Sequence, residues 1–507
     1  MMLCIPCDKS RKIVLCSFIF FVVCFFAGTA NSAVFNVGST RQYTMPSQVA
    51  SLVSDGDTVE IDAGVYDDCT TWNANNLLLE GIGDGYAHCE NNVCGEKGIW
   101  VIYGDNTTIA NMEFSGAAIS ASEGENGAGI RAQGGSFTIR RCYFHDNQDG
   151  ILSDPAHTGS SVLIEYSVFA YNGAGDGYSH NLYIGNNISA GDSIRYDSLV
   201  FRYNFTHGAK VGNNLKSRAN RNYILYNRIM DDSDGTASWD IDLPNGGLAV
   251  IMGNEIEKGP NAQNSNTMEC GLEGVINTPP HTLCIVNNTF VNDVGRGTFI
   301  NLPSTGVDSV LIMNNIFAGS SSLISSSPAV IDSAANIVSP TISSVGLTDP
   351  AEYNYQLTAT SPARAKGVTI DADDGVSLTP IYEYADTANM RARPMQTALD
   401  IGAYQYAAPQ GIPELYGVYE NHAGNGLQYE IALNPIRHEL DFSVGNDYIR
   451  ILKIDAFDQL GRQLETRFQE INPGKFSLKT SNIPAGVYII RAYTTAGLAL
   501  GKALVLK

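Results

Sequence analysis

Short segments in which apolar and polar positions alternate recur along most of the chain, separated by turns rich in Gly, Asn and Asp. The phrase appears as TIANMEFSG, TIRRCYFHDN, LIEYSVFAYN, VFRYNFTHG, ILYNRIMDD, VIMGNEIEK, CIVNNTFVN and LIMNNIFAG. Its last inward position falls at Phe114, Phe144, Phe169, Thr206, Ile229, Ile256, Phe290 and Phe317. The repeat is about 27 residues long and varies with loop insertions, which is typical of a solenoid. Alternation with a period of two predicts stacked short strands and excludes a helical solenoid.

An asparagine stands two residues before each of the later inward positions, at Asn204, Asn227, Asn254, Asn288 and Asn315. Coils stacked at the strand spacing of about 4.8 Å place such side chains directly above one another. Their amides can then hydrogen-bond to each other and to the turn backbone as a ladder. The repeat therefore predicts an all-β parallel β-helix.

Both ends of the repeat region carry closing segments. MPSQVASLVSDGDTVEIDAGVYDD predicts a short amphipathic helix and a first strand, and ALDIGAYQY ends the repeats near residue 400. These segments resemble those of the secreted right-handed β-helix proteins, which usually begin with a GDTV…GVY strand and end in DIGAYEY. The resemblance covers residues 34–406 and implies a right-handed, single-stranded parallel β-helix.

A different unit follows a linker at 407–418. Alternating strands in residues 419–507 predict a small antiparallel β-sandwich. This unit resembles the C-terminal sorting domain of type IX secretion substrates, through Asn434-Pro435, Gly461, the IPAGVY run and the basic-ended last strand. The resemblance implies a Bacteroidetes-type cell, the type IX translocon as a partner, and an extracellular or cell-surface location. An ordinary sandwich without a sorting role is the alternative.

Residues 1–33 have the order of a secretory signal: Lys9, Arg11 and Lys12 come before an apolar run, and small residues follow it. Removal of this segment leaves a chain with no membrane span, which we expect to be a monomer; a retained anchor is the alternative. Six cysteines remain after Ala33, and an oxidising compartment permits disulfides among them. We favour a bridge between Cys270 and Cys284.

The chain has 52 Asp and Glu against 31 Lys and Arg, a net charge of −21. This balance argues against nucleic-acid or anionic-membrane binding. Between Arg195 and Arg228, however, seven Lys and Arg accompany a single acid, Asp197. An anionic partner would therefore be bound locally, in this region.

Strand alternation predicts which side chains of this region face outward. In the coil NNLKSRANRN these are Lys216 and Arg218, with Leu215 and Ser217 inward. The predicted outward stripe over four successive coils contains Asn181 and Tyr183, then Lys216 and Arg218, then Asp240 and Asp242, then Glu269 and Glu273.

This stripe contains the parts that β-elimination on a uronic-acid chain requires: a group that neutralises the carboxylate, a base and a proton donor. We predict Lys216 as the base, with its pKa lowered by the neighbouring Arg218, and Arg218 as the carboxylate ligand. Tyr183 or His180 is the predicted proton donor. The predicted Ca²⁺ ligands are Asp240, Asp242 and Glu269, and the predicted substrate-binding residues are Asn181, Asn245 and Arg131.

LKSRANRNYILYNRI is similar to the NKS…N…N coil of the chondroitinase-B/alginate-lyase family of β-helix polysaccharide lyases. The resemblance implies a lyase of an anionic polysaccharide, with Lys216 as base beside Ser217 and Asn220. HNLYIG resembles that family's calcium strand but lacks its acidic ligand, and Asp242 stands where the family has an arginine.

Other functions remain open from the sequence. Asp240 and Asp242 on one strand would lie about 6.5–7 Å apart, near the geometry of an inverting glycoside hydrolase. A C5-epimerase would use the same proton abstraction as a lyase, and a non-catalytic glycan-binding or adhesin β-helix needs neither.

Overall fold

A computed structural model describes residues 32–185, 194–326, 330–370, 377–394, 396 and 398–407, and the backbone of seven strands between 429 and 505. Its contacts divide the chain into two units, Met1–Tyr406 and Ala407–Lys507. Most of the predicted signal segment and linker lie outside the described residues. Within the described residues, no helix has the length and apolar character needed to cross a membrane.

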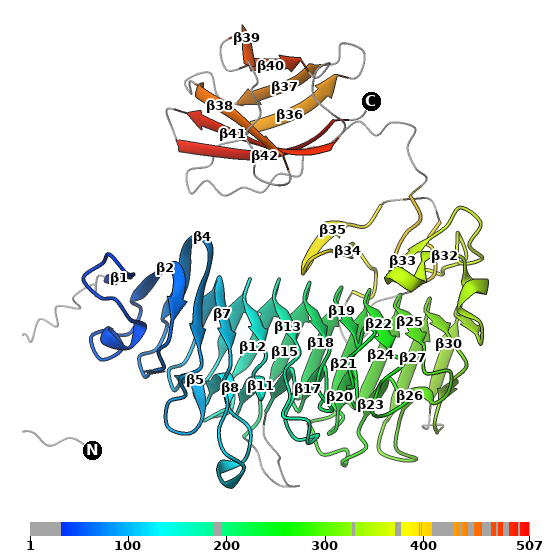
Figure 1. Ribbon diagram of the computed structural model, residues 1–507. Helices are drawn as coiled ribbons and strands as arrows, with labels where there is room; N and C mark the ends of the chain where they lie inside the picture. The colour runs from blue at the N-terminus through cyan, green and yellow to red at the C-terminus, as the bar shows by residue number, and fades with distance from the viewer. Residues whose placement is uncertain are drawn as a thin grey trace, which may run out of the picture. The chain divides into compact units, whose positions relative to one another are not determined.

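The first unit is the predicted right-handed parallel β-helix, in which successive coils contribute one strand to each of three faces (Figure 1). The first face comprises β6 (Thr107–Ala110), β9 (Phe137–Arg140), β12 (Ser161–Glu165), β15 (Ser198–Arg202), β18 (Arg221–Leu225), β21 (Leu248–Met252), β24 (Thr282–Val286), β27 (Ser309–Met313) and β30 (Ile331–Ala334). The second comprises β7 (Met112–Ser115), β10 (Tyr143–His145), β13 (Val168–Ala170), β16 (Phe205–His207), β19 (Arg228–Met230), β22 (Glu255–Lys258), β25 (Thr289–Asn292), β28 (Ile316–Ala318) and β31 (Ile337–Ser339).

The third face is a ten-stranded parallel sheet. It comprises β3 (Thr70–Trp72), β5 (Gly98–Ile102), β8 (Ala128–Ala132), β11 (Asp149–Ser153), β14 (Leu182–Ile184), β17 (Leu215–Ser217), β20 (Ile241–Leu243), β23 (Met268–Cys270), β26 (Thr298–Asn301) and β29 (Ser322–Ile324). At the N-terminal end, β1 (Val34–Val37) pairs with β2 (Thr58–Tyr66), and the long β4 (Leu78–Glu90) pairs with strands of both other faces.

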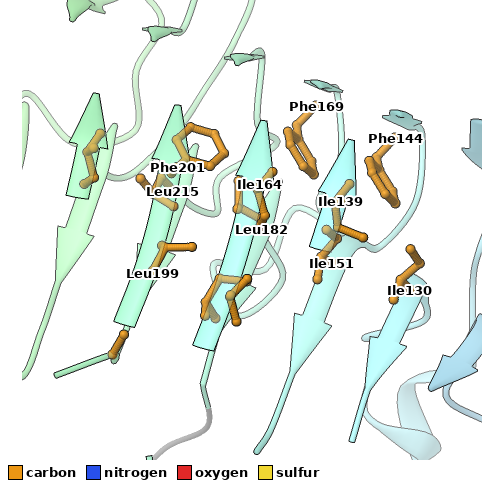
Figure 2. Packing of buried hydrophobic residues seen from close by; sticks show 14 of the residues in the cluster. Ile130, Ile139, Phe144, Ile151, Ile164, Phe169, Leu182, Leu199, Phe201 and Leu215 are labelled. Atoms are coloured by element: carbon orange, nitrogen blue, oxygen red, sulfur yellow. The ribbon is translucent and has the colours of Figure 1, made fainter. Parts of the chain in front are cut away.

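Side chains of like position stack in rows along the inside of the solenoid (Figure 2). Phe144 lies opposite Phe169 in the register of β10 and β13, and their rings stack with centroids 4.9 Å apart. On the third face, Ile151 lies opposite Leu182 in the same way. Every inward position that the repeat predicts occupies such a row, because parallel strands in register repeat each side chain on the next coil.

The predicted asparagine ladder lies at the turn between the first and second faces. Asn227 donates its backbone N–H to Oδ1 of Asn254 at 2.8 Å, and its side-chain amide donates to the same oxygen at 2.9 Å. Asn254 repeats both bonds with Asn288, and its side-chain amide also reaches the carbonyl of Ile224 at 2.8 Å. The ladder satisfies buried turn groups that the strands leave without partners.

Two predictions from the sequence are wrong, one about the N-terminal segment and one about the disulfide. The N-terminal segment forms a 3-10 turn, η1 (Pro46–Gln48), rather than an amphipathic helix, since the stretch before Gly56 is too short to stabilise one. The disulfide joins Cys69 and Cys94, not Cys270 and Cys284. Cys270 packs inside the solenoid on the third face, whereas Cys284 lies on the outer side of the first face, in a cluster with Tyr226 and Val250, so the wall of the β-helix separates the two thiols.

After the last coil the chain forms two short antiparallel pairs. These are β32 (Leu347–Asp349) with β33 (Asn354–Leu357), and β34 (Tyr382–Ala385) with β35 (Asn389–Ala392). Further short 3-10 turns are η2 (Ala121–Glu123), η3 (Ile342–Val345) and η4 (Pro350–Glu352).

The second unit contains two antiparallel sheets, as expected for a small sandwich. One is formed by β36 (Tyr429–Asn434), β37 (Glu439–Val444), β40 (Lys475–Lys479) and β39 (Phe468–Asn472). The other is formed by β38 (Ile451–Asp458), β41 (Gly486–Thr494) and β42 (Gly497–Val505).

Candidate functional site

Four predicted site residues form one continuous row on the outer side of the third face. In the register of β14, β17, β20 and β23, Tyr183 lies opposite Lys216, Lys216 opposite Asp242, and Asp242 opposite Glu269. Leu152 and Arg131 continue the row toward the N-terminus, and Asn301 continues it toward the C-terminus. Strand alternation alone therefore located the row, which we call the outer row.

Lys216 is an outward side chain that is nevertheless buried by its neighbours, with 8% of its surface exposed. Its ammonium donates to Oδ2 of Asp242 at 2.7 Å and to Oε1 of Glu273 at 3.0 Å. The Nζ atom also lies 5.5 Å from the ring centroid of Tyr183. Lys216 is thus held between an acid on the next coil, an acid two coils away and an aromatic ring on the preceding coil.

Arg218 spreads its guanidinium over three partners. Nε donates to the hydroxyl oxygen of Tyr183 at 2.6 Å, one terminal nitrogen donates to Oδ1 of Asn245 at 2.8 Å, and the other donates to Oε2 of Glu273 at 2.5 Å. The predicted substrate ligand Asn245 therefore orients Arg218. Glu273 bridges both cations with its two carboxylate oxygens, and its side chain stays 46% exposed.

The expected lowering of the Lys216 pKa by Arg218 is wrong. Burial works in that direction, but attraction and hydrogen bonds to Asp242 and then Glu273 outweigh it, so the pKa of Lys216 is raised. Burial also lowers the pKa of Arg218, but the interactions with Tyr183 and Glu273 outweigh it, so this pKa is raised. Both groups are held as cations.

Tyr183 and His180, the two predicted proton donors, pack edge to face with ring centroids 5.3 Å apart. Burial raises the pKa of Tyr183, and this outweighs the opposing effect of Arg218. Burial, followed by repulsion from Lys216 and Arg218, lowers the pKa of His180 to about 3. His180 is therefore neutral, and its Nδ1 accepts the backbone N–H of Asn213 at 2.9 Å, which assigns the ring proton to Nε2.

Asp242 and Glu269 form a buried carboxyl pair beside the cations. Oδ2 of Asp242 accepts from Lys216 and from the side-chain amide of Asn213 at 2.6 Å. Burial, followed by the hydrogen bond and charge of Asp242, raises the pKa of Glu269 well above its ordinary value. Glu269 thus binds a proton more tightly than an ordinary glutamate does. Sequence alternation did not reveal Asn213, because that residue precedes its strand in a turn.

Asp240 and Asn181 were expected to face outward, and they do not. Each lies immediately before its strand, where the turn interrupts the alternation and directs the side chain into the solenoid. The Asn181 amide donates to the side chain of Asn214, and the Asn214 amide donates to Oδ1 of Asp240, each at 3.0 Å. Asp240 there belongs to a buried cluster with Asp231 around Lys258, whose Nζ is 3.1 Å from Asp231 and 3.7 Å from Asp240.

This separation removes the hydrolase pair of Asp240 and Asp242, and it also breaks the predicted calcium set. Ca²⁺ takes six to eight oxygen ligands. Asp242 and Glu269 remain adjacent, but Lys216 already occupies Oδ2 of Asp242, and Asp240 is withdrawn to another cluster. The residues present do not fit a calcium ion.

Two cavities in the described part of the chain lie away from the outer row. One, of about 630 Å³, opens on the first face and has Arg202 as its only charged lining residue. The other, of about 410 Å³, lies where β34 meets the second face and contains Arg228 and Glu255, an ion pair at 2.7 Å. We place the candidate site at the outer row because there the cations, acids and aromatic hydroxyl converge.

No protein-family model matches the chain, and no curated protein matches it. The structure is similar to that of pectate lyase Pel9A, with a TM-score of 0.46 and 12% identity over 75% of this chain and 98% of that chain. It is also similar to ORF18 of Geobacillus virus E2, with a TM-score of 0.34 and 13% identity over 78% and 68% of the two chains. For the Dettilon tailspike protein the TM-score is 0.24 and the identity 11%, over 89% and 84% of the two chains. Likenesses this distant carry no argument about function, and the β-helix is established by the strand pairings themselves.

Proposed function

We propose that this protein cleaves an anionic, uronic-acid-containing polysaccharide by β-elimination at the outer row. The supporting observation is the placement of Glu273, a half-exposed carboxylate that bridges Lys216 and Arg218 with one oxygen on each. A uronate carboxylate has the same charge and the same two oxygens. It can therefore replace Glu273 on the two cations when the sugar chain binds.

Neutralisation of the uronate carboxylate is what makes elimination possible, because it acidifies the proton on the adjacent C5 carbon. Lys216 and Arg218 supply two positive charges at one carboxylate. A guanidinium suits bidentate binding of a carboxylate, and an ammonium adds a point charge. Since Asp242 holds Lys216 as an ammonium, we assign Lys216 to neutralisation rather than to proton abstraction.

The proton-transfer group in this proposal is Tyr183. Its phenolate removes the C5 proton, the electrons of that bond form the C4–C5 double bond, and the C4–O bond breaks. The resulting phenol then donates the same proton to the leaving oxygen, so that Tyr183 returns to its starting state. The hydrogen bond from Nε of Arg218 stabilises the phenolate, while burial opposes it.

His180 contributes position rather than a proton in this mechanism. Its neutral ring packs edge-on against Tyr183, and Asn213 fixes its tautomer. Asn245 likewise fixes the guanidinium plane of Arg218. Arg131 lies farther along the outer row, beyond Leu152, where it can contact a neighbouring sugar acid of a long chain.

The test is incubation of the mature protein with alginate, pectate, glucuronan and glycosaminoglycans, followed by the ultraviolet absorbance of an unsaturated uronate. Absorbance on one of these substrates supports the lyase. Inverted C5 stereochemistry without absorbance would indicate an epimerase, and binding without either would indicate a glycan-binding protein. Hydrolysis of a neutral glycan while every anionic glycan stays intact would overturn the proposal.

The proposal includes export through the type IX pathway, with the second unit as the sorting domain. Deletion of residues 407–507 in a Bacteroidetes host should retain the β-helix in the periplasm, as detected by fractionation and immunoblotting. Normal secretion of the truncated chain would remove the sorting role without affecting the lyase.

A further inference from the structure

Two histidines and a glutamate meet on three successive strands of the second face, whereas the outer row lies on the third face. His88 of β4 lies opposite Glu113 of β7, and His145 of β10 lies one row over, opposite Ser115. Oε1 of Glu113 is 3.0 Å from Nε2 of His145 and 3.7 Å from Nδ1 of His88. Among the residues that the structure describes, this is the place where three possible metal ligands lie within 4.8 Å of one another.

The two distances from Glu113 are close to those between the ligands of a small divalent ion. Ligand atoms bound at about 2.0–2.1 Å in a tetrahedron lie about 3.3 Å from one another. The observed 3.0 and 3.7 Å therefore bracket the expected value, and all three ligand atoms lie within 4.8 Å of one another. The three side chains are 17%, 21% and 20% exposed, which leaves a path for the ion and room for a water ligand.

The remaining ring nitrogens of both histidines are held by oxygen atoms. Nδ1 of His145 is 3.0 Å from Oδ2 of Asp146, and Nε2 of His88 is 2.7 Å from the hydroxyl of Ser115. Histidines that bind metals commonly donate their second ring N–H to such an oxygen, which fixes the tautomer and orients the ring. The support for the two imidazoles is thus already built.

We propose that His88, Glu113 and His145 form a binding site for a divalent transition-metal ion, with Zn²⁺ as the best fit. Two imidazoles and one carboxylate favour zinc over calcium or magnesium, which prefer oxygen ligands alone. Water completes the tetrahedron. The ion ties three coils together near the N-terminal end of the solenoid, independently of any activity at the outer row.

The test uses the tag-free mature protein, freed of metal with a chelator and dialysed, and titrated calorimetrically with Zn²⁺. We expect one equivalent to bind, an upward shift of Tm with Zn²⁺, and a tetrahedral absorption spectrum with Co²⁺. His88→Ala and His145→Ala should each lower the Zn²⁺ affinity by more than 100-fold. Asp146→Asn should lower it by about 10- to 100-fold.

The matched control is His157→Ala, which removes a half-exposed histidine lying outside the cluster. It should bind Zn²⁺ as tightly as the unaltered protein. Thermal unfolding of each variant without metal verifies that it is folded. The proposal is overturned if the unaltered protein binds no Zn²⁺ saturably, or if His88→Ala and His145→Ala bind as tightly as His157→Ala.

Discussion

The asparagine ladder and the outer row both follow the axis of the same solenoid, yet they differ in how residues repeat along them. In the ladder each coil supplies the same side chain, and each amide bonds to the next. In the outer row every coil supplies a different one, in the order Arg131, Leu152, Tyr183, Lys216, Asp242, Glu269 and Asn301. Uniform repetition satisfies buried backbone groups, whereas the varied row brings cations, acids and an aromatic hydroxyl together. The comparison predicts that changes in the ladder affect stability and changes in the outer row affect activity.

Tyr183→Phe should have the largest effect of the substitutions considered, and this effect should be on activity. Loss of the only group assigned to proton transfer should lower kcat/KM about 1,000-fold. Tm should fall by only a few degrees, because the ring remains in place and only the bond from Nε of Arg218 loses its acceptor. Since burial raises the pKa of Tyr183, the proposed activity of the unaltered protein should rise by about tenfold per pH unit through the neutral and mildly alkaline range. Substantial activity in the variant would exclude Tyr183 as the proton-transfer group.

Asn254→Ala should lower the stability of the folded protein. The substitution leaves the backbone N–H and the side-chain amide of Asn227, and the carbonyl of Ile224, without these partners inside a buried turn. We expect a loss of about 3 kcal/mol in the free energy of unfolding, measured by denaturant titration. Asn389→Ala, at an exposed position, is the control and should change stability by less than about 0.5 kcal/mol. Equal effects of the two substitutions would mean that the ladder stabilises little.

Substitutions of Lys216 test whether this residue neutralises the uronate carboxylate or acts as the base. Lys216→Ala should lower kcat/KM about 100-fold, whereas Lys216→Arg, which keeps the positive charge, should stay within about tenfold of the unaltered protein. Steady-state kinetics on the polyuronate identified by the substrate panel provides the measurement. If Lys216→Arg is as inactive as Lys216→Ala while Tyr183→Phe remains active, the base is Lys216, as the sequence resemblance implies.

The same difference in repetition explains how much could be predicted from the sequence. The coils, the inward positions and the ladder follow from periodicity, because each is confirmed many times along the chain. Strand alternation correctly predicts the outward direction of Tyr183, Lys216, Asp242 and Glu269, which lie within strands. Alternation fails one residue before a strand, and for that reason Asp240 and Asn181 were placed on the wrong side.

Long-range partners were beyond the reach of periodicity. Alternation placed Glu273 in the outward stripe but did not predict its bond to Lys216, because Glu273 lies 57 residues away in sequence and reaches back over two coils from a turn. The bridge between Cys69 and Cys94 likewise depends on how the first coils close. Neither contact has a periodic signal.

Glu273→Gln tests whether the Glu273 carboxylate occupies the position that a uronate carboxylate would take. The neutral amide competes less with a uronate for Lys216 and Arg218, so KM should fall about threefold while kcat changes little. A higher KM would instead show that Glu273 organises the two cations for the substrate. Initial rates over a range of polysaccharide concentrations separate the two outcomes.

Glu269→Gln should have the smallest effect, visible as a pH dependence of stability. The pKa of Glu269 is raised by burial and by Asp242. The folded state therefore binds this proton more tightly than the unfolded state, whose pKa is 4.5. The resulting stability is present below that pH and is lost as pH rises toward the folded pKa. Glutamine is neutral throughout and can still donate to Asp242, so the variant should match the unaltered protein at pH 4.5 and gain about 2 °C in Tm at pH 8.

Glu273→Gln is the matched control for this last measurement, because the pKa of Glu273 is lowered. Burial opposes that shift, but Arg218 and Lys216 outweigh it. The stability that Glu273 contributes is therefore present at neutral pH and is lost as pH falls, which is the opposite sign. Relative to the unaltered protein, Glu269→Gln should thus gain Tm with rising pH while Glu273→Gln loses it. Parallel trends in the two variants would mean that the outer row does not hold one acid protonated and the other charged, and the assignment of Glu273 as the carboxylate that a substrate displaces would fail with it.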